Sequence, residues 1–106
     1  MKIIYVTLND SNEARTIGNL LLEKNLANCV NFFPITCIYK YEGEITEEPE
    51  IVLIIKTQKD KYDEIAKVIK SVIDYDNFIG ELDVNTINSD FEKWLTDIVS
   101  FKGDEK

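Results

Sequence analysis

The sequence predicts a single α+β domain with a split βαβ arrangement, in which a four-stranded antiparallel sheet carries two helices on one face. The chain of 106 residues is the usual size of one domain, and 44% of it is hydrophobic, so one real core can form. The hydrophobic period changes between that of strands and that of helices in the order β-α-β-β-α-β-α. No linker or internal repeat interrupts this order, so residues 1–106 form one predicted domain with a core over about 2–99.

The chain should begin with a strand that leads directly into a helix. Residues 2–8 are apolar and β-branched, and polar residues follow them. Asp10, with Glu13 three positions later, is typical of a helix start, because a side-chain acceptor can satisfy free backbone amides of the first turn. Apolar residues then recur at helical spacing over 14–22, where Gly18 is expected to allow close packing against the sheet.

A long hairpin is predicted next. Residues 28–42 follow the period of strands, with Pro34 at a bulge or an edge position, and Gly43 marks a turn. The return segment is acidic before a buried strand over 51–55. Both strands are longer than a compact domain needs, and such an overhang exposes backbone and apolar surface unless another chain covers it. We therefore predict oligomerisation, with interface residues Tyr39, Tyr41 and Trp94.

After the hairpin, the sequence predicts a second helix, a fourth strand and a last helix. A helix is expected from Asp60, and the acidic segment 74–77 ends its apolar stripe. Alternation over 78–85 predicts another strand, and residues 88–90 can cap a last helix. Residues 102–106 should fray. The apolar face of the last helix is expected to comprise Phe91, Trp94, Leu95 and Ile98.

The net charge of the chain makes polyanionic partners unfavourable. Twelve Lys and Arg against 20 Asp and Glu give a net charge of −8, which disfavours nucleic acid and anionic membranes and could attract cations. No apolar run approaches the length of a transmembrane helix, and the first ten residues have too short an apolar run for a signal peptide and no cleavage site. These features predict a cytoplasmic protein.

The sequence lacks the residues of conventional catalytic sites. It contains no histidine and no phosphate-binding glycine loop, so we predict that it is not an enzyme. Cys29 and Cys37 would lie roughly 26 Å apart on one strand, too far for a disulfide, and should be reduced thiols. Each cysteine can be interpreted either as a soft ligand for copper(I) or, more simply, as a small core residue.

Four other polar residues are weaker candidates. Asp74 and Asp76 flank Tyr75 in a loop, and Glu81 lies on the following strand. They could form a carboxylate site, although turn formers and surface acids are common at such positions, and the calcium-loop pattern fails here. Lys56 follows an apolar strand, where it could contact an anion at the rim of a cleft or simply extend to solvent.

Four segments carry a family resemblance. Residues 26–31 (LANCVN) are similar to L-A-A-C-V-N, and residues 38–45 (IYKYEGEI) to a hairpin Y-x-W-x-G-x-I, with Tyr41 at the tryptophan position. Residues 53–57 (LIIKT) are similar to a strand ending in L-x-x-K-T, and residues 91–95 (FEKWL) to a helix with Y-x-x-W-L. In this order and spacing, the set resembles the CutA family of divalent-cation tolerance proteins.

The resemblance implies a ferredoxin-like protomer in a homotrimer whose long hairpins pair across subunits. The family is linked to copper and divalent-cation tolerance, and no catalytic reaction transfers from it. We expect ions or small ligands to bind in clefts between subunits. The residues expected at these clefts are Cys29, Lys56, Tyr75, Asp76 and Glu81, and a weakly bound divalent cation or copper would involve Cys29, Asp74 and Asp76.

The chain departs from the family where metal ligands are expected. The family's H-P-Y-[EQ]-x-P-x-I segment corresponds to residues 73–80 (IDYDNFIG), which keep only Tyr75 and the acid at Asp76. Ile73 stands at the histidine position, and Val6 stands where some members have a copper-linked cysteine. A Cys/His copper site is therefore not carried over. A trimeric ligand-sensing signalling module and a structural scaffold remain the alternatives, with a carboxylate enzyme ranked last.

Overall fold

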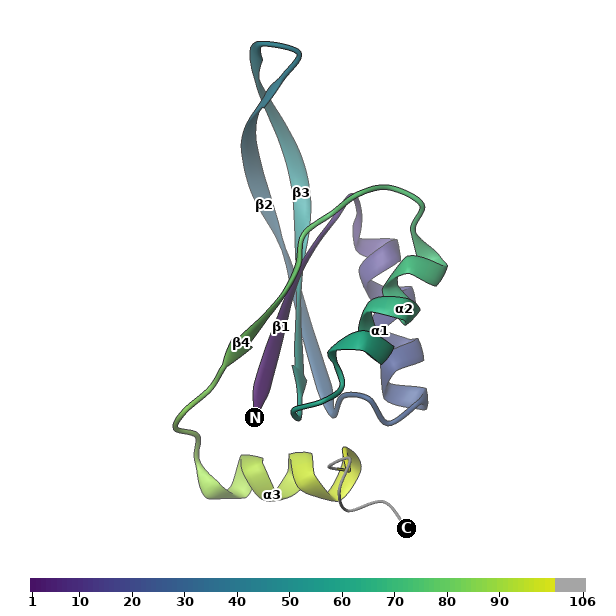
Figure 1. Ribbon diagram of the computed structural model, residues 1–106, viewed down its shortest axis with the longest axis vertical. Coiled ribbons are helices and arrows are strands. Elements are labelled where there is room, and N and C mark those ends of the chain that lie inside the picture. Colours follow the sequence, from purple (N-terminus) through teal and green to yellow (C-terminus); the bar gives the residue numbers. More distant parts are fainter. Residues whose placement is uncertain (101–106) are drawn as a thin grey trace.

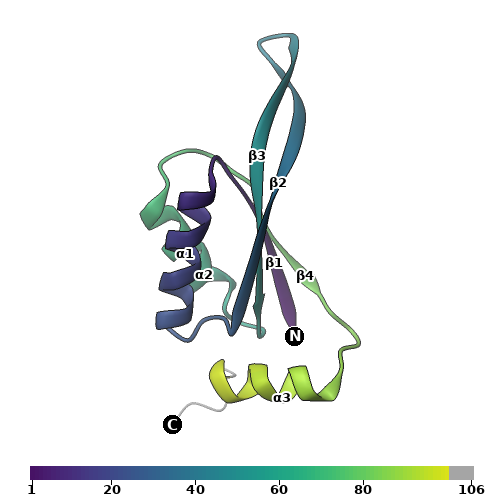
Figure 2. The same cartoon turned by 180° about the vertical axis from the view of Figure 1, so that it is seen from behind.

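The computed structural model describes residues 1–100 and confirms the predicted fold class. The four strands form one antiparallel sheet in the order β2-β3-β1-β4, and α1 and α2 cover one of its faces (Figures 1 and 2). The predicted fraying of residues 102–106 concerns positions outside the described part. The elements are β1 (Lys2–Leu8), α1 (Ser11–Glu23), β2 (Cys29–Tyr41), β3 (Glu44–Thr57), α2 (Tyr62–Val72), β4 (Ile79–Asp83) and α3 (Ser89–Ile98).

The first helix begins as its sequence predicts. The Asp10 side chain accepts a hydrogen bond from the Glu13 amide, and the Glu13 carboxylate accepts one from the Asp10 amide in return. The prediction for Gly18 is also confirmed, because a Cβ atom there would lie 2.8 Å from Cγ2 of Val30. The absence of a side chain at position 18 is what lets α1 approach β2 so closely.

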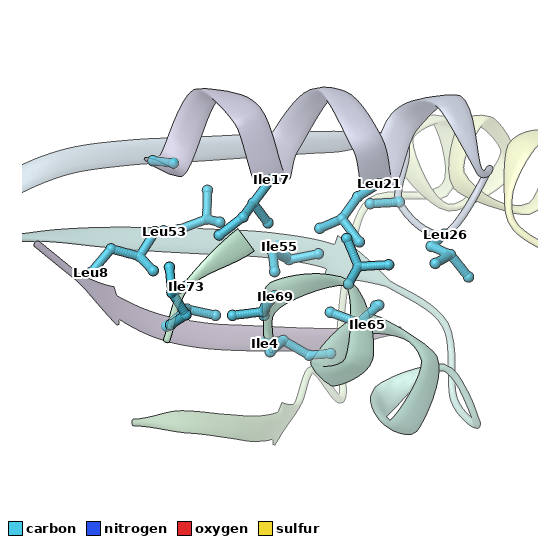
Figure 3. Close-up of a cluster of buried hydrophobic side chains, with 14 residues drawn as sticks. Ile4, Leu8, Ile17, Leu21, Leu26, Leu53, Ile55, Ile65, Ile69 and Ile73 are labelled. Atoms are coloured by element: carbon cyan, nitrogen blue, oxygen red, sulfur yellow. The ribbon is translucent and has the colours of Figure 1, made fainter. Parts of the chain in front are cut away.

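The core lies between the sheet and the two helices (Figure 3). Alternate residues of β1 and β3 point to the helices, and Ile4 pairs with Ile55 in the sheet. The helices contribute one stripe each at helical spacing, and the core side chains are almost entirely shielded from water. The labelled members of this cluster are Ile4, Leu8, Ile17, Leu21, Leu26, Leu53, Ile55, Ile65, Ile69 and Ile73.

Beyond the helices, β2 and β3 continue alone as a projecting ribbon, which we call the arm (residues 35–50). β1 ends at Leu8, opposite Ile51, whereas β2 and β3 pair without a break as far as Tyr41 and Glu44. Figure 1 shows the arm extending well past α1 and α2. Pro34 is predicted at either a bulge or an edge strand. It lies on the edge strand β2 and pairs regularly with Ile51, so the edge position is confirmed and the bulge is not.

The sheet face opposite α1 and α2, which we call the open face, carries apolar side chains from all four strands. The Phe78 ring folds over Gly80, where an added Cβ would come within 2.4 Å of it, and its centroid lies 6.0 Å from that of Tyr5. Phe33, Phe78 and Leu82 keep 42%, 51% and 56% of their surface exposed. Within the described residues, this apolar surface is left without a covering helix.

The last helix lies across the end of the sheet near the start of β1 (Figures 1 and 2). Its predicted apolar face is only partly buried, because Leu95 is buried while Trp94 is 48% exposed. Asn88 occupies the cap position, but its side chain donates to Asp90 instead of capping an amide. Among residues 1–100, no helix is both long and apolar enough to cross a membrane.

The bounds of β4 and α2 differ from the predictions. β4 covers Ile79–Asp83 instead of residues 78–85, because its partner strand β1 begins at Lys2, which pairs with Asp83. α2 begins at Tyr62, two residues after the predicted start, because Asp60 takes a left-handed backbone conformation with φ of 67°.

Candidate functional site

Two of the predicted site residues meet at the foot of the sheet, near α3. Cys29 opens β2 directly opposite Lys56 of β3, and both point to the open face. The Cys29 thiol lies 4.0 Å from Oδ1 of Asn31. The Lys56 ammonium lies 5.5 Å from the centroid of the Phe91 ring on α3, within the range of a cation–π interaction.

A hollow of about 270 Å³ opens beside Lys56, and we call it the basal hollow. The segment between β4 and α3 forms one side of it, and the Phe91 ring forms another. Phe91 is itself held in an edge-to-face contact with Trp94, with ring centroids 5.4 Å apart. The basal hollow combines the Lys56 ammonium with apolar and hydroxyl or amide groups, and its lining residues are Met1, Lys56, Thr86, Ile87, Asn88 and Phe91.

Tyr75 lies at the other end of β1 and is engaged by the fold itself. Its hydroxyl donates a hydrogen bond of 2.6 Å to the Glu13 carboxylate and accepts one of 2.9 Å from the Asn9 amide. Burial, together with the bond to Glu13, raises the pKa of Tyr75 well above its ordinary value. The phenol therefore stays protonated and joins the loop after α2 to the start of α1.

Asp74 and Asp76 are exposed in that same loop, on either side of Tyr75. The loop is held by two residues that the sequence did not single out. The Lys70 ammonium donates to the Tyr75 carbonyl oxygen at 3.0 Å and to Oδ1 of Asn77 at 2.9 Å. The Asn77 side chain then donates to the carbonyl oxygen of Thr7. A surface lysine and a turn asparagine carry no pattern that would have shown this.

Glu81 lies on the helix side of β4 and lines a second hollow of about 230 Å³ with Asp60, Tyr62 and Asp63. Its carboxylate is 4.0 Å from the ammonium of Lys2, which also pairs with Asp83. The hydrogen bond from Lys2 lowers the pKa of Asp83. The nearby lysine therefore offsets part of the negative charge at Glu81.

The remaining polar side chains of interest lie on the arm. Burial and the neighbouring Glu50 raise the pKa of the Cys37 thiol, which disfavours its reactive thiolate form. A hydrogen bond to Glu48 raises the pKa of Tyr39 in the same region. Tyr41, near the tip, is 60% exposed. Both Cys37 and Cys29 are free thiols, as predicted.

Within one chain, the predicted site residues fall into separate groups. Lys56 pairs with Ile3 near the start of β1, whereas Tyr75 contacts Asn9 just beyond its end. Five strand positions separate Ile3 from Leu8, which corresponds to roughly 17 Å. Among residues 1–100, no group of three or more Cys, Asp or Glu side chains could hold a metal ion.

The sequence over residues 2–98 matches the family described as CutA1 divalent ion tolerance protein. It is 35% identical over 96 residues to the divalent-cation tolerance protein CutA of Pyrococcus horikoshii, a match that covers 90% of this chain and 94% of that one. It is 32% identical over 100 residues to the protein of the same name from Thermotoga maritima, covering 93% and 99% of the two chains.

The fold is also similar to solved structures. The periplasmic divalent cation tolerance protein CutA from Archaeoglobus fulgidus superposes with a TM-score of 0.88 at 33% identity, over 94% of this chain and 100% of that one. CutA1 from Pyrococcus horikoshii superposes with a TM-score of 0.86 at 31% identity, over 95% and 100%.

Proposed function

This chain belongs to the CutA1 family of divalent ion tolerance proteins, and on that basis we propose that it acts in divalent metal-ion tolerance, copper included, as a homotrimer with binding clefts between its subunits. The match over residues 2–98 is the observation that carries this proposal. The relatives are named for tolerance and not for a reaction, so we propose a binding protein instead of an enzyme.

The arm and the open face support assembly. Ile38 and Ile45 on the arm are 65% and 77% exposed, and the open face adds the exposed ring of Phe33. A paired ribbon with apolar side chains is only marginally stable alone in water. A closed ring of three copies would cover these surfaces and satisfy the free edge of β2. Tyr39, Tyr41 and Trp94 are the proposed interface residues.

Metal binding would require residues from more than one copy. Cys29 lies at the foot of the sheet, whereas Asp74 and Asp76 lie in the loop after α2, so one chain does not bring these candidates together. The proposal therefore places any divalent cation or copper between subunits, where it would bind weakly without histidine.

Calorimetric titration at neutral pH with copper and with zinc tests the metal part of the proposal. We expect binding that weakens in Cys29→Ser for copper and in the double variant Asp74→Asn/Asp76→Asn for zinc. Cys37→Ser, which changes the other free thiol, is the matched control and should leave both titrations unchanged. The absence of heat, together with an unchanged unfolding temperature, would exclude metal binding.

A trimeric ligand-sensing module is the second candidate function, and the basal hollow is the observation that favours it. Binding of a small ligand to the folded state alone would raise the unfolding temperature, which a purely structural scaffold would not show. A thermal-shift screen of small metabolites separates these two possibilities.

We also propose a cytoplasmic location. The Archaeoglobus fulgidus relative is described as periplasmic, a location that this proposal does not extend to the present chain. Fractionation of cells that express the chain should place it with cytoplasmic markers, and its release with the periplasmic fraction would contradict this.

A further inference from the structure

We propose that the basal hollow binds a small aromatic carboxylate, with Lys56 as the partner of the carboxylate and the Phe91 ring as the wall against which the ligand's ring packs. This inference deepens the proposed function, because it rests on the small-ligand role and names a ligand class for it. Three features of the basal hollow carry the inference: a cation with no ion pair among residues 1–100, a fixed aromatic wall and a small volume.

The cation is the first feature. Lys56 is half-buried, and its cross-strand neighbours, Cys29 and Ile3, are not acids. No described carboxylate forms an ion pair with it, in contrast to Lys2, which lies between Glu81 and Asp83. Because Lys56 has no counter-ion within residues 1–100, its ammonium group at the edge of the hollow is suited to donate a charge-assisted hydrogen bond to an anion.

Asp90, which directly precedes Phe91 on α3, does not fill this role. The Asp90 carboxylate accepts a hydrogen bond of 2.6 Å from the Asn88 side chain. That bond, followed by bonds from the backbone amides of Asp90 and Phe91, lowers the pKa of Asp90. Asp90 is therefore occupied at the start of its own helix, and the Lys56 ammonium faces the Phe91 ring instead.

The aromatic wall is the second feature. Phe91 is half-buried and is fixed by its contact with Trp94, at an interplanar angle of 77°. Ile87 and Met1 extend this apolar wall, and both are also half-buried. A flat apolar ring can pack against Phe91 while its carboxylate reaches Lys56. An inorganic anion would use only the cation, and a neutral ring would use only the wall.

The volume is the third feature. About 270 Å³ lies just below the usual range of roughly 300–1,000 Å³ for small-molecule sites. The basal hollow therefore has room for one ring with a short acidic group. The hydroxyl of Thr86 and the amide of Asn88 border the same space and can orient the second carboxylate oxygen.

The single tryptophan of the chain provides a direct reporter, because Trp94 contacts the Phe91 wall. We would titrate the full chain with benzoate in the presence of a metal chelator, following Trp94 fluorescence and confirming by calorimetry. Benzamide, its neutral isostere, and inorganic phosphate serve as comparison probes. We expect saturable benzoate binding, at least tenfold weaker benzamide binding and no phosphate binding.

Variants then assign the binding to the two named residues. Lys56→Met should weaken benzoate binding at least tenfold, whereas Lys56→Arg should retain it within a few-fold. Phe91→Leu should weaken the binding of the ring severalfold. Lys67→Met makes the same change at an exposed lysine of α2 and should have no effect. Unchanged unfolding temperatures of these variants would show that they fold.

Equal binding of benzamide and benzoate, benzoate binding that survives Lys56→Met, or no benzoate binding at millimolar concentrations would each overturn the inference. Sedimentation of the same samples measures the oligomeric state, and so tests the proposed trimer independently of the benzoate site. A trimer that ignores benzoate refutes the site alone. A monomer that binds benzoate through Lys56 refutes the assembly and leaves the site intact.

Discussion

The long hairpin of β2 and β3 has two halves, a core half that belongs to the four-stranded sheet and an arm half that projects beyond it. The two halves differ in what covers them. In the core half, β3 runs between β2 and β1 under two helices, and Leu53 and Ile55 are fully buried. In the arm half, the same strand has only β2 beside it, and Ile45 is 77% exposed. The length of β1 makes this difference, because β1 ends opposite Ile51.

The comparison indicates that one half of the hairpin contributes to the stability of the chain and the other half to its association. Burial of apolar surface within the chain stabilises the core half. The arm lacks such burial in one chain, so its apolar side chains can contribute fully only when another surface covers them. Substitutions in the two halves should therefore change different quantities, stability in the core and association in the arm.

The largest expected effect is that of a cavity in the core. Leu53→Ala removes a fully buried side chain from the middle of the sheet, and we expect a loss of about 2–5 kcal/mol in the free energy of unfolding. Urea unfolding at one fixed protein concentration measures it. A loss below about 1 kcal/mol would show that the core half is less tightly packed than its burial indicates.

Overpacking at the interface between α1 and β2 should have the next largest effect. Gly18→Ala places a Cβ atom 2.8 Å from Cγ2 of Val30, and we expect a cost of about 1–3 kcal/mol despite the better helix propensity of alanine. The double variant Gly18→Ala/Val30→Ala should recover part of that cost in the same unfolding assay. Additive losses would mean that the two residues do not compete for space.

Tyr75→Phe should lower the free energy of unfolding by only about 1 kcal/mol. The loss is small because the Asn9 amide still donates a hydrogen bond to the Glu13 carboxylate when the hydroxyl is removed. The substitution should also change the pH dependence. The pKa of Tyr75 is raised in the folded state, so its contribution is fully present below the ordinary tyrosine pKa of 10.0 and is lost as pH rises above that value.

Unfolding at pH 8 and above pH 10 measures this difference. Wild type should lose more stability than Tyr75→Phe over this interval. Tyr5→Phe, at a tyrosine of β1 that is not among the proposed interface residues, is the control and should follow wild type. Identical alkaline losses in wild type and Tyr75→Phe would contradict the role assigned to the hydroxyl.

An effect of similar size but opposite sign is expected at Asn28, which directly precedes β2 at the foot of the sheet. Its side chain is 6% exposed, and neither Oδ1 nor Nδ2 has a hydrogen-bond partner among residues 1–100. Because unsatisfied buried polar atoms are costly, Asn28→Ala should stabilise the protein by about 1 kcal/mol in urea unfolding. A loss of stability would indicate that the amide has a partner in solution, such as a bound water.

Much of this fold could be predicted from local patterns. The pairing of Asp10 with Glu13 depends on a spacing of three residues, and the role of Gly18 follows from a small residue on a packed helix face. The overhanging arm followed from strand lengths alone. The end of β4 was predicted less well, because it depends on where its partner β1 begins, at Lys2.

The candidate site could be predicted only in part, because its contacts join distant residues. Cys29 and Lys56 are paired by strand register, but the position of Phe91 over Lys56 depends on how α3 crosses the sheet. The bond between Tyr75 and Glu13 spans 62 positions, so no local pattern reveals it. The lack of histidine, in contrast, could be read directly.

Sedimentation velocity across a range of protein concentrations tests the central claim, that the arm is completed by other copies of the chain. We predict a species of three times the 12.3 kDa chain mass for wild type. Ile38→Thr/Ile45→Thr should shift it toward the single chain at low concentration, with the core still folded. A stable single chain of wild type at every concentration would contradict the account.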